Sequence, residues 1–180
     1  MPSPLRKRNF MKFIELPLQG AYLIEPDPSF DERGYFARTF CRDEFKAKGL
    51  VFEFIQMSTS FNEHKGQIRG MHFQKPPHLE TKLVRCTKGA LYDIIQDIRE
   101  ESKTFGKYAV IKLSQKNRRM LYIPKGFAHG FKTLEDSTEV FYMMDEIYDP
   151  GSAASTAENL ESFFECRFKE YIFPTLKALV

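Results

Sequence analysis

Tryptophan is absent from this 180-residue sequence, and cysteine occurs only three times, as Cys41, Cys86 and Cys166. The three cysteines are odd in number and widely spaced, and none forms a CxxC pair. The sequence therefore predicts neither a disulfide framework nor a cysteine-ligated metal. Three reduced thiols are typical of a cytoplasmic protein, and a lone catalytic cysteine is the less favoured alternative.

Long apolar runs are also absent. No stretch reaches the roughly 18 apolar residues that a membrane-spanning helix needs, so we expect no membrane partner. The basic residues Arg6, Lys7 and Arg8 precede no apolar segment, which argues against a signal peptide and favours a flexible tail over residues 1–11. The net charge of +3 suits a small anionic ligand and is too weak to indicate nucleic acid.

Glycine motifs that bind nucleotide cofactors are missing as well, since neither GxGxxG nor GxxxxGKS/T occurs. Short segments rich in Val, Ile, Phe and Tyr are instead separated by Gly, Pro and Asn, which predicts an all-β sandwich or barrel. No strands alternate with helices, so a doubly wound sheet is not expected. The expected elements are hairpins over 81–99 and 108–123, a strand over 138–144 and a short helix over 41–49 that stops at Gly49.

One domain is expected over residues 12–150. From residue 151 the composition becomes small and polar, and residues 158–168 have a helical pattern. We interpret residues 151–180 as a divergent C-terminal tail of the same domain.

Two of the four histidines stand in informative surroundings. His129 lies in Pro124-Lys125-Gly126-Phe127-Ala128-His129, a PxGxxH spacing that matches half of the cupin signature. His72 lies in a predicted strand, where it shares a face with Gln74. A metal-binding cupin has a second His where Gln74 stands, and an amide is a poor ligand for a transition metal. The pattern therefore predicts a cupin-type jelly-roll barrel without a metal, and a metal-dependent cupin oxygenase or isomerase is the alternative.

Several ordered motifs together resemble the dTDP-4-dehydrorhamnose 3,5-epimerase family, over roughly Phe13 to Tyr148. They are Asp31-Glu32-Arg33-Gly34-Tyr35-Phe36, Phe54-Ile55-Gln56-Met57-Ser58-Thr59-Ser60, Arg69-Gly70-Met71-His72-Phe73-Gln74, Lys82-Leu83-Val84, Asp97-Ile98-Arg99, Pro124 to Phe131, and Tyr142 with Tyr148 six residues on.

The resemblance implies a proton relocation on a nucleotide-linked 4-keto-6-deoxy sugar. The C3 and C5 hydrogens flank the C4 ketone, which serves as the electron sink, so no cofactor is implied. His72 is similar to the family's base, and an imidazole is largely neutral at pH 7. Tyr142 corresponds to the acid on the other face of the sugar, since a phenol arrives protonated. Lys82 corresponds to the group that stabilises the enolate oxygen.

Binding roles are implied in the same way. Arg33 and Arg69 resemble contacts to the diphosphate, which suits a bidentate guanidinium. Other contacts to the substrate are implied for five residues: Gln56, Ser58, His129, Phe36 and Tyr148. The family pairs two subunits, and the N-terminal region of one completes the site of the other, so a homodimer is implied.

The tail departs from the family pattern. The family has an Asp near its C-terminus that pairs with the catalytic His, and no acidic residue follows Glu170 here. Glu170, Asp93 and Asp97 are the carboxylates that could replace it. Three readings follow: a 3,5-epimerase, an enzyme that epimerises only C3 or only C5, or a sugar-nucleotide-binding cupin with impaired catalysis.

Overall fold

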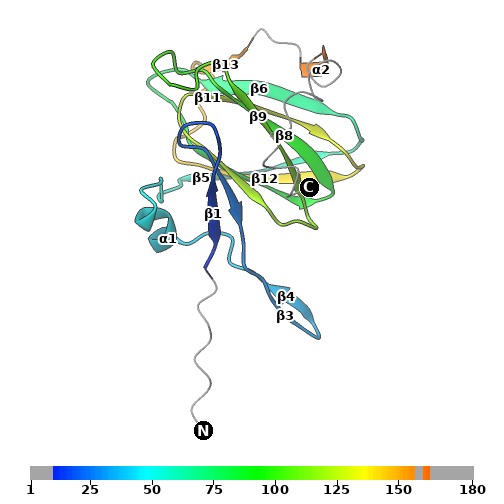
Figure 1. Cartoon of the computed structure of the whole chain (residues 1–180). Helices are drawn as coiled ribbons and strands as arrows, with labels where there is room; N and C mark the ends of the chain where they lie inside the picture. Colours follow the sequence, from blue (N-terminus) through cyan, green and yellow to red (C-terminus); the bar gives the residue numbers. More distant parts are fainter. Residues whose placement is uncertain (1–9, 157–159, 163–180) are drawn as a thin grey trace.

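The computed structural model describes residues 10–156 and 160–162, and within them two antiparallel sheets face each other (Figure 1). The larger sheet has the order β1 (Lys12–Glu15), β2 (Tyr22–Glu25), β10 (Met120–Ile123), β7 (Lys82–Lys88), β12 (Thr138–Met144) and β5 (Gln56–Asn62). The smaller sheet has the order β13 (Ala153–Ser155), β6 (Ile68–Gln74), β11 (Phe127–Thr133), β8 (Ala90–Asp97) and β9 (Tyr108–Ser114).

The core lies between the two sheets. Alternate residues of each strand point inward, so Val84 and Leu121 of the larger sheet pack with Leu91 and Ile95 of the smaller one. All four side chains are fully shielded from solvent. Two sheets that enclose one core in this way form the cupin-type jelly roll, and the predicted all-β class is confirmed.

Both predicted hairpins are wrong in their pairing, although their strands exist. A turn at Gly89, whose φ is +74°, joins β7 to β8. However, β7 pairs with β10 and β12 in the larger sheet, whereas β8 pairs with β9 and β11 in the smaller one. The connection from β9 to β10 also crosses between the sheets. Each connection is an arch, as the jelly roll requires.

The predicted helix and the predicted strand over 138–144 are both present. Helix α1 (Arg42–Ala47) ends before Gly49, whose φ of +69° suits a residue without a Cβ. Its Phe45 is fully buried on the outer face of the larger sheet and contacts the rings of Phe40, Phe54 and Tyr122.

The two ends of the described chain are both attached to the barrel. Residues 1–9 of the predicted flexible tail lie outside the described residues, and Met11 is buried, with its N–H donating to the Glu44 carboxylate at 2.8 Å. β13 extends the smaller sheet by pairing with β6. Of the helix predicted over 158–168, the structure describes α2 (Leu160–Ser162). Neither described helix is long and apolar enough to cross a membrane.

A hairpin arm projects from the barrel. β3 (Ser29–Asp31) and β4 (Gly34–Phe36) pair only with each other, and the arm extends away from the two sheets in Figure 1. Three aromatic side chains on the arm are exposed, and Phe36, at 74%, is the most exposed of them. The Arg118 guanidinium lies 5.0 Å from the centre of the Tyr35 ring, a cation–π contact between the arm and the segment before β10.

Candidate active site

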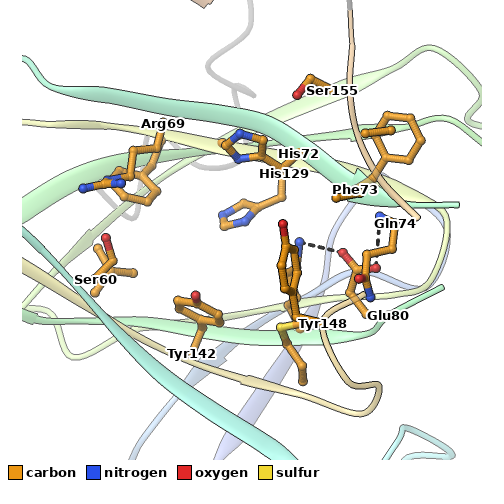
Figure 2. A pocket seen from close by; sticks show the side chains of 17 residues that line it. Ser60, Arg69, His72, Phe73, Gln74, Glu80, His129, Tyr142, Tyr148 and Ser155 are labelled. Carbon is orange, nitrogen blue, oxygen red and sulfur yellow. Dashed lines mark hydrogen bonds and ion pairs between the residues drawn. The ribbon is translucent and has the colours of Figure 1, made fainter. Parts of the chain in front are cut away.

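A cavity of about 420 Å³ opens between the two sheets. Figure 2 shows its walls, with His72, His129 and Arg69 on one side and Tyr142 and Ser60 on the other. The lining residues are Ser60, Arg69, His72, Phe73, Gln74, Glu80, Lys82, His129, Gly130, Phe131, Val140, Tyr142, Met144, Tyr148, Ala153, Ala154 and Ser155. Imidazole, phenol, ammonium and guanidinium groups therefore meet in one pocket.

A bulge in β6 shapes the side of the cavity that carries Arg69, His72 and His129, here called the cationic wall. His129 of β11 lies opposite His72, and Phe131 lies opposite Arg69, so two β6 residues face Gly130 alone. Gly70 lies in this bulge with a φ of +113°, and a Cβ on it would lie 2.4 Å from the Gly130 Cα. The extra residue shifts the alternation of the strand, so Arg69 and His72 point to the same side although they are three residues apart.

His72 stands at the open mouth of this pocket. Protein atoms around the ring lower the pKa of His72 by partial burial, and the positive charges of Lys82, His129 and Arg69 lower it further. A lowered pKa keeps the imidazole neutral near pH 7. Asp93 and Asp97 are two candidates for the carboxylate partner of His72. Neither pairs with it, because Asp93 lies against His129 and Asp97 pairs with Arg99. Glu170 lies outside the described residues.

His129 stands beside a buried carboxylate. Its Nε2 lies 2.9 Å from Oδ1 of Asp93, which is fully buried on β8. Burial raises the pKa of Asp93, while the adjacent His129 acts in the opposite direction. The contact places the largely shielded ring of His129 between this carboxylate and the cavity that it lines.

Tyr142, Lys82 and Glu80 come from the larger sheet and the segment before it. Tyr142 lies on β12 opposite Val84 of β7. Lys82 opens β7, and its Nζ lies 2.8 Å from Oε1 of Glu80. Both members of this ion pair are largely shielded, with side-chain exposures of 12% for Lys82 and 4% for Glu80.

Two glutamines hold the segment that carries Tyr148. The Gln56 side-chain oxygen accepts the Tyr148 N–H at 2.8 Å, and the Gln74 side-chain oxygen accepts the Asp149 N–H at 2.6 Å. The Gln74 amide donates to the carbonyls of His78 and Ile147. Gln74 is thereby occupied by main-chain groups and fixes the pocket rim. Across residues 10–156 and 160–162, no three His, Cys, Asp or Glu side chains gather closely enough to hold a metal ion.

The structure brings together some of the predicted site residues and leaves others apart. Those that line the cavity are His72, Lys82, Tyr142, Arg69, His129 and Tyr148. Gln56 stands behind Tyr148, and Ser58 lies on β5 opposite Tyr142 without lining the cavity. Arg33 and Phe36 lie on the exposed arm, where the Arg33 side chain pairs with Asp31.

Sequence reasoning did not assign site positions to Glu80 and Ser60. The carboxylate of Glu80 lies two residues before Lys82 in a loop, where no strand alternation predicts its direction. Ser60 shares a face with Gln56 and Ser58 by the period of two, so the pattern that selected those residues also indicated it.

Comparison with known proteins identifies the family of this chain. A sequence profile of the dTDP-4-dehydrorhamnose 3,5-epimerase family matches residues 15–163. The chain is 42% identical over 139 residues to a dTDP-4-dehydrorhamnose 3,5-epimerase of Methanothermobacter thermautotrophicus, covering 77% of this chain and 74% of the relative.

Solved structures of epimerases are similar to this chain as well. The epimerase of Bacillus anthracis, with TDP and pyrophosphate bound, superposes with a TM-score of 0.81 at 40% identity, covering 83% of this chain and 86% of that one. A 3,5-epimerase of Legionella pneumophila in complex with dTDP-4-keto-L-rhamnose gives a TM-score of 0.77 at 35% identity, with 81% and 77% covered. The chain therefore belongs to the dTDP-4-dehydrorhamnose 3,5-epimerase family and is an epimerase that acts on sugar nucleotides.

Proposed function

We propose that this protein converts dTDP-4-dehydro-6-deoxyglucose to dTDP-4-dehydrorhamnose, with His72 as the base and Tyr142 as the acid. The observation that carries the proposal is the location of these two groups on facing sheets, with the cavity between them (Figure 2). A sugar ring held between the sheets would present one face to each group. Epimerisation requires this arrangement, because the proton leaves one face and returns to the other.

The chemistry of each step follows from the groups. His72 in its neutral form takes the proton from C3 or C5, and the electrons of the broken C–H bond form an enolate at the C4 oxygen. Lys82 stabilises the negative charge that develops on this oxygen. Tyr142 returns a proton to the carbon from the opposite face, and the C4 ketone is restored. The substrate supplies its own electron sink. His72 then releases its proton to solvent and Tyr142 regains one from solvent, so both groups return to their starting forms before the second carbon reacts.

Binding of the nucleotide would use the cationic wall and the exposed arm. Arg69 lies at one end of the pocket, where its guanidinium can hold phosphate oxygens, and its Nε donates to Asn62 at 2.8 Å, which orients it. Ser58 and Gln56, which both lie on β5, would add polar contacts to the substrate. His129 and Tyr148 would contact the sugar. Solved complexes of two relatives contain dTDP-linked sugars, which favours the same class of ligand here.

We also propose a homodimer in which the arm of one subunit reaches the pocket of the other. β5 is an edge strand of the larger sheet, and its outer face exposes Met57 and Phe61 beside Ile55. A large apolar patch on an edge strand favours an interface. The arm adds Phe36 and brings Arg33, whose side chain does not line the cavity of its own subunit.

The experiment that tests the function is proton exchange in heavy water. The purified protein is mixed with dTDP-4-keto-6-deoxyglucose, and the C3 and C5 protons are followed by NMR. We expect deuterium at both carbons, and loss of exchange in His72→Ala with retained binding of dTDP. Exchange at one carbon would replace the proposal with a mono-epimerase. Binding without exchange in the wild-type protein would replace it with an impaired sugar-nucleotide-binding cupin.

A further inference from the structure

Glu80 is a buried carboxylate that contacts two elements of the pocket at once. One oxygen lies 2.8 Å from the Lys82 Nζ, and the other accepts the main-chain N–H of Gln74 at 3.1 Å. Glu80 therefore joins the end of β6 to the start of β7, at the place where the two sheets meet around the cavity. Figure 2 shows Glu80 and Gln74 together at one end of the pocket.

We propose that Glu80 is the positioning residue that holds the Lys82 ammonium against the reacting end of the pocket. The inference rests on the enolate-stabilising role proposed above for Lys82. A lysine has a long, freely rotating stem and a point charge at its tip, so its place in a pocket depends on what anchors it. An enolate is stabilised only if the charge is already in position when the oxygen becomes negative.

The neighbouring carboxylates do not offer a second anchor. Asp93 lies against His129, and although the charge of Lys82 lowers the pKa of Asp93, no ion pair between described residues joins the two. Asp145 accepts the Thr81 N–H at 2.6 Å and pairs with Lys125 at 3.2 Å. Among the described residues, Glu80 is the carboxylate that pairs with Lys82.

The other cationic groups of the pocket favour such an anchor. The positive charges of Arg69 and Lys82 both act on His72, and both lower the pKa of its imidazole. Like charges in one pocket repel, so an ammonium without a carboxylate partner would be displaced from its position. Glu80 opposes this movement because its carboxylate is fixed by the β6 main chain.

A double-mutant cycle tests the proposal. Glu80→Gln keeps the size of the side chain and removes its charge, Lys82→Met removes the ammonium, and the double variant removes both. Each is measured for kcat of exchange at C3 and C5, for affinity toward dTDP and for thermal unfolding. Glu139→Gln is the matched control, because Glu139 accepts a hydrogen bond from Thr87 on the larger sheet and does not line the cavity.

We expect Glu80→Gln to lower kcat by up to about a hundredfold, the effect that a 1 Å misplacement of a catalytic group can have, with unchanged dTDP affinity. In the Lys82→Met background the same change should have no further effect on kcat. The control should retain wild-type kcat. An equal fall in both backgrounds, or a parallel loss of dTDP binding, would overturn the positioning role.

A second variant keeps the test decisive if Glu80→Gln does not fold. Glu80→Asp preserves the charge and shortens the side chain by one methylene, so the carboxylate should not reach Lys82 and Gln74 together. We expect a folded protein with lowered kcat. Wild-type kcat in Glu80→Asp would assign Glu80 to stability alone. Wild-type kcat in Lys82→Met, or no exchange in the wild-type protein, would instead contradict the proposed function on which this inference rests.

Discussion

At the scale of single residues, the environment of His72 is set by what surrounds the ring. Partial burial and the charges of Lys82, His129 and Arg69 all favour the neutral imidazole. A family member would be expected to carry a carboxylate on the far ring nitrogen, which would act in the opposite direction. Among the described residues no carboxylate pairs with His72, and partial burial, followed by the cationic neighbours, lowers the pKa of its imidazole.

The pH dependence of exchange follows from this environment. The pKa of His72 is lowered from its usual 6.5, so the neutral base persists as the pH falls below that value. We therefore expect the acidic limb of kcat/KM to have its midpoint below 6.5, with activity lost as the pH falls through the lowered pKa. The measurement is the initial rate of deuterium uptake from about pH 5 to pH 8. A midpoint above 6.5 would mean that a carboxylate acts on His72 in the working enzyme.

At the scale of elements, local pattern predicted strands better than it predicted their partners. The alternation over 138–144 coincides with β12, and the stop at Gly49 ends α1 as expected. Gly89 predicted a turn, and the turn exists. A tight turn between two strands serves a hairpin or an arch between sheets equally well, and only the packing of the whole barrel selects one. The sequence around Gly89 therefore could not identify the partners of β7 and β8.

The same limit applies to the site. The period of two predicted that His72 and Gln74 share a face, and both line the cavity. It did not predict that Arg69 joins them, because that depends on the bulge at Gly70 opposite Gly130. The pairing of Asp93 with His129 depends on the register between β8 and β11, which the sequence does not encode locally. Motif resemblance identified the cavity residues where periodicity alone did not.

A glycine pair makes the bulge possible, and its removal should be costly. Gly70→Ala would place a Cβ 2.4 Å from the Gly130 Cα at a φ of +113°. We expect a loss of more than about 2 kcal/mol in the free energy of unfolding, because main-chain atoms must move apart. Denaturant unfolding measures it.

The control for this change is Gly66→Ala. Gly66 also has a positive φ, of +86°, but no atom lies within 4 Å of the position that an added Cβ would take. The expected loss is about 1 kcal/mol, from backbone strain without a clash. Equal losses for the two variants would mean that the approach of β6 to β11 is not under steric control by Gly70.

At the scale of the whole molecule, Asp97 ties the end of β8 to the loop that follows it. Burial by itself would raise the pKa of Asp97, but hydrogen bonds from Arg99, Ser102 and Thr104 outweigh it and lower the pKa to about 2. Through Arg99 the network also reaches the carbonyl of Gln19 at 2.8 Å, before β2. It therefore connects segments about eighty residues apart in the sequence.

Acid should weaken this network within a defined window. A carboxyl whose pKa is lowered by folding stabilises the folded state above its usual value of 3.8, and that contribution disappears as the pH falls from about 3.8 to about 2. We expect Asp97→Asn to lower the thermal midpoint at pH 7, with the difference from wild type shrinking through this window. A difference that does not change with pH would show that the charge of Asp97 contributes nothing to stability.

The proposed dimer assigns Arg33 and His72 of one working site to different subunits, and this can be tested by mixing inactive variants. Arg33→Ala and His72→Ala subunits, unfolded together and refolded, form mixed dimers in half of the cases by random pairing. Each mixed dimer contains one complete site, in which the subunit that retains His72 receives Arg33 from its partner. We expect about a quarter of the wild-type rate of exchange from the mixture, although each variant alone has little.

Mixing His72→Ala with Tyr142→Phe is the matched control for this complementation. Both residues line the cavity of a single subunit, so no pairing of these two variants produces a site with both groups. The first mixture should therefore recover activity and the second should not. Recovery in neither would place Arg33 at the pocket of its own subunit, and would require the exposed arm to fold back onto the barrel that carries it. Recovery in both would mean that His72 and Tyr142 of one site come from different subunits, against the cavity between β6 and β12.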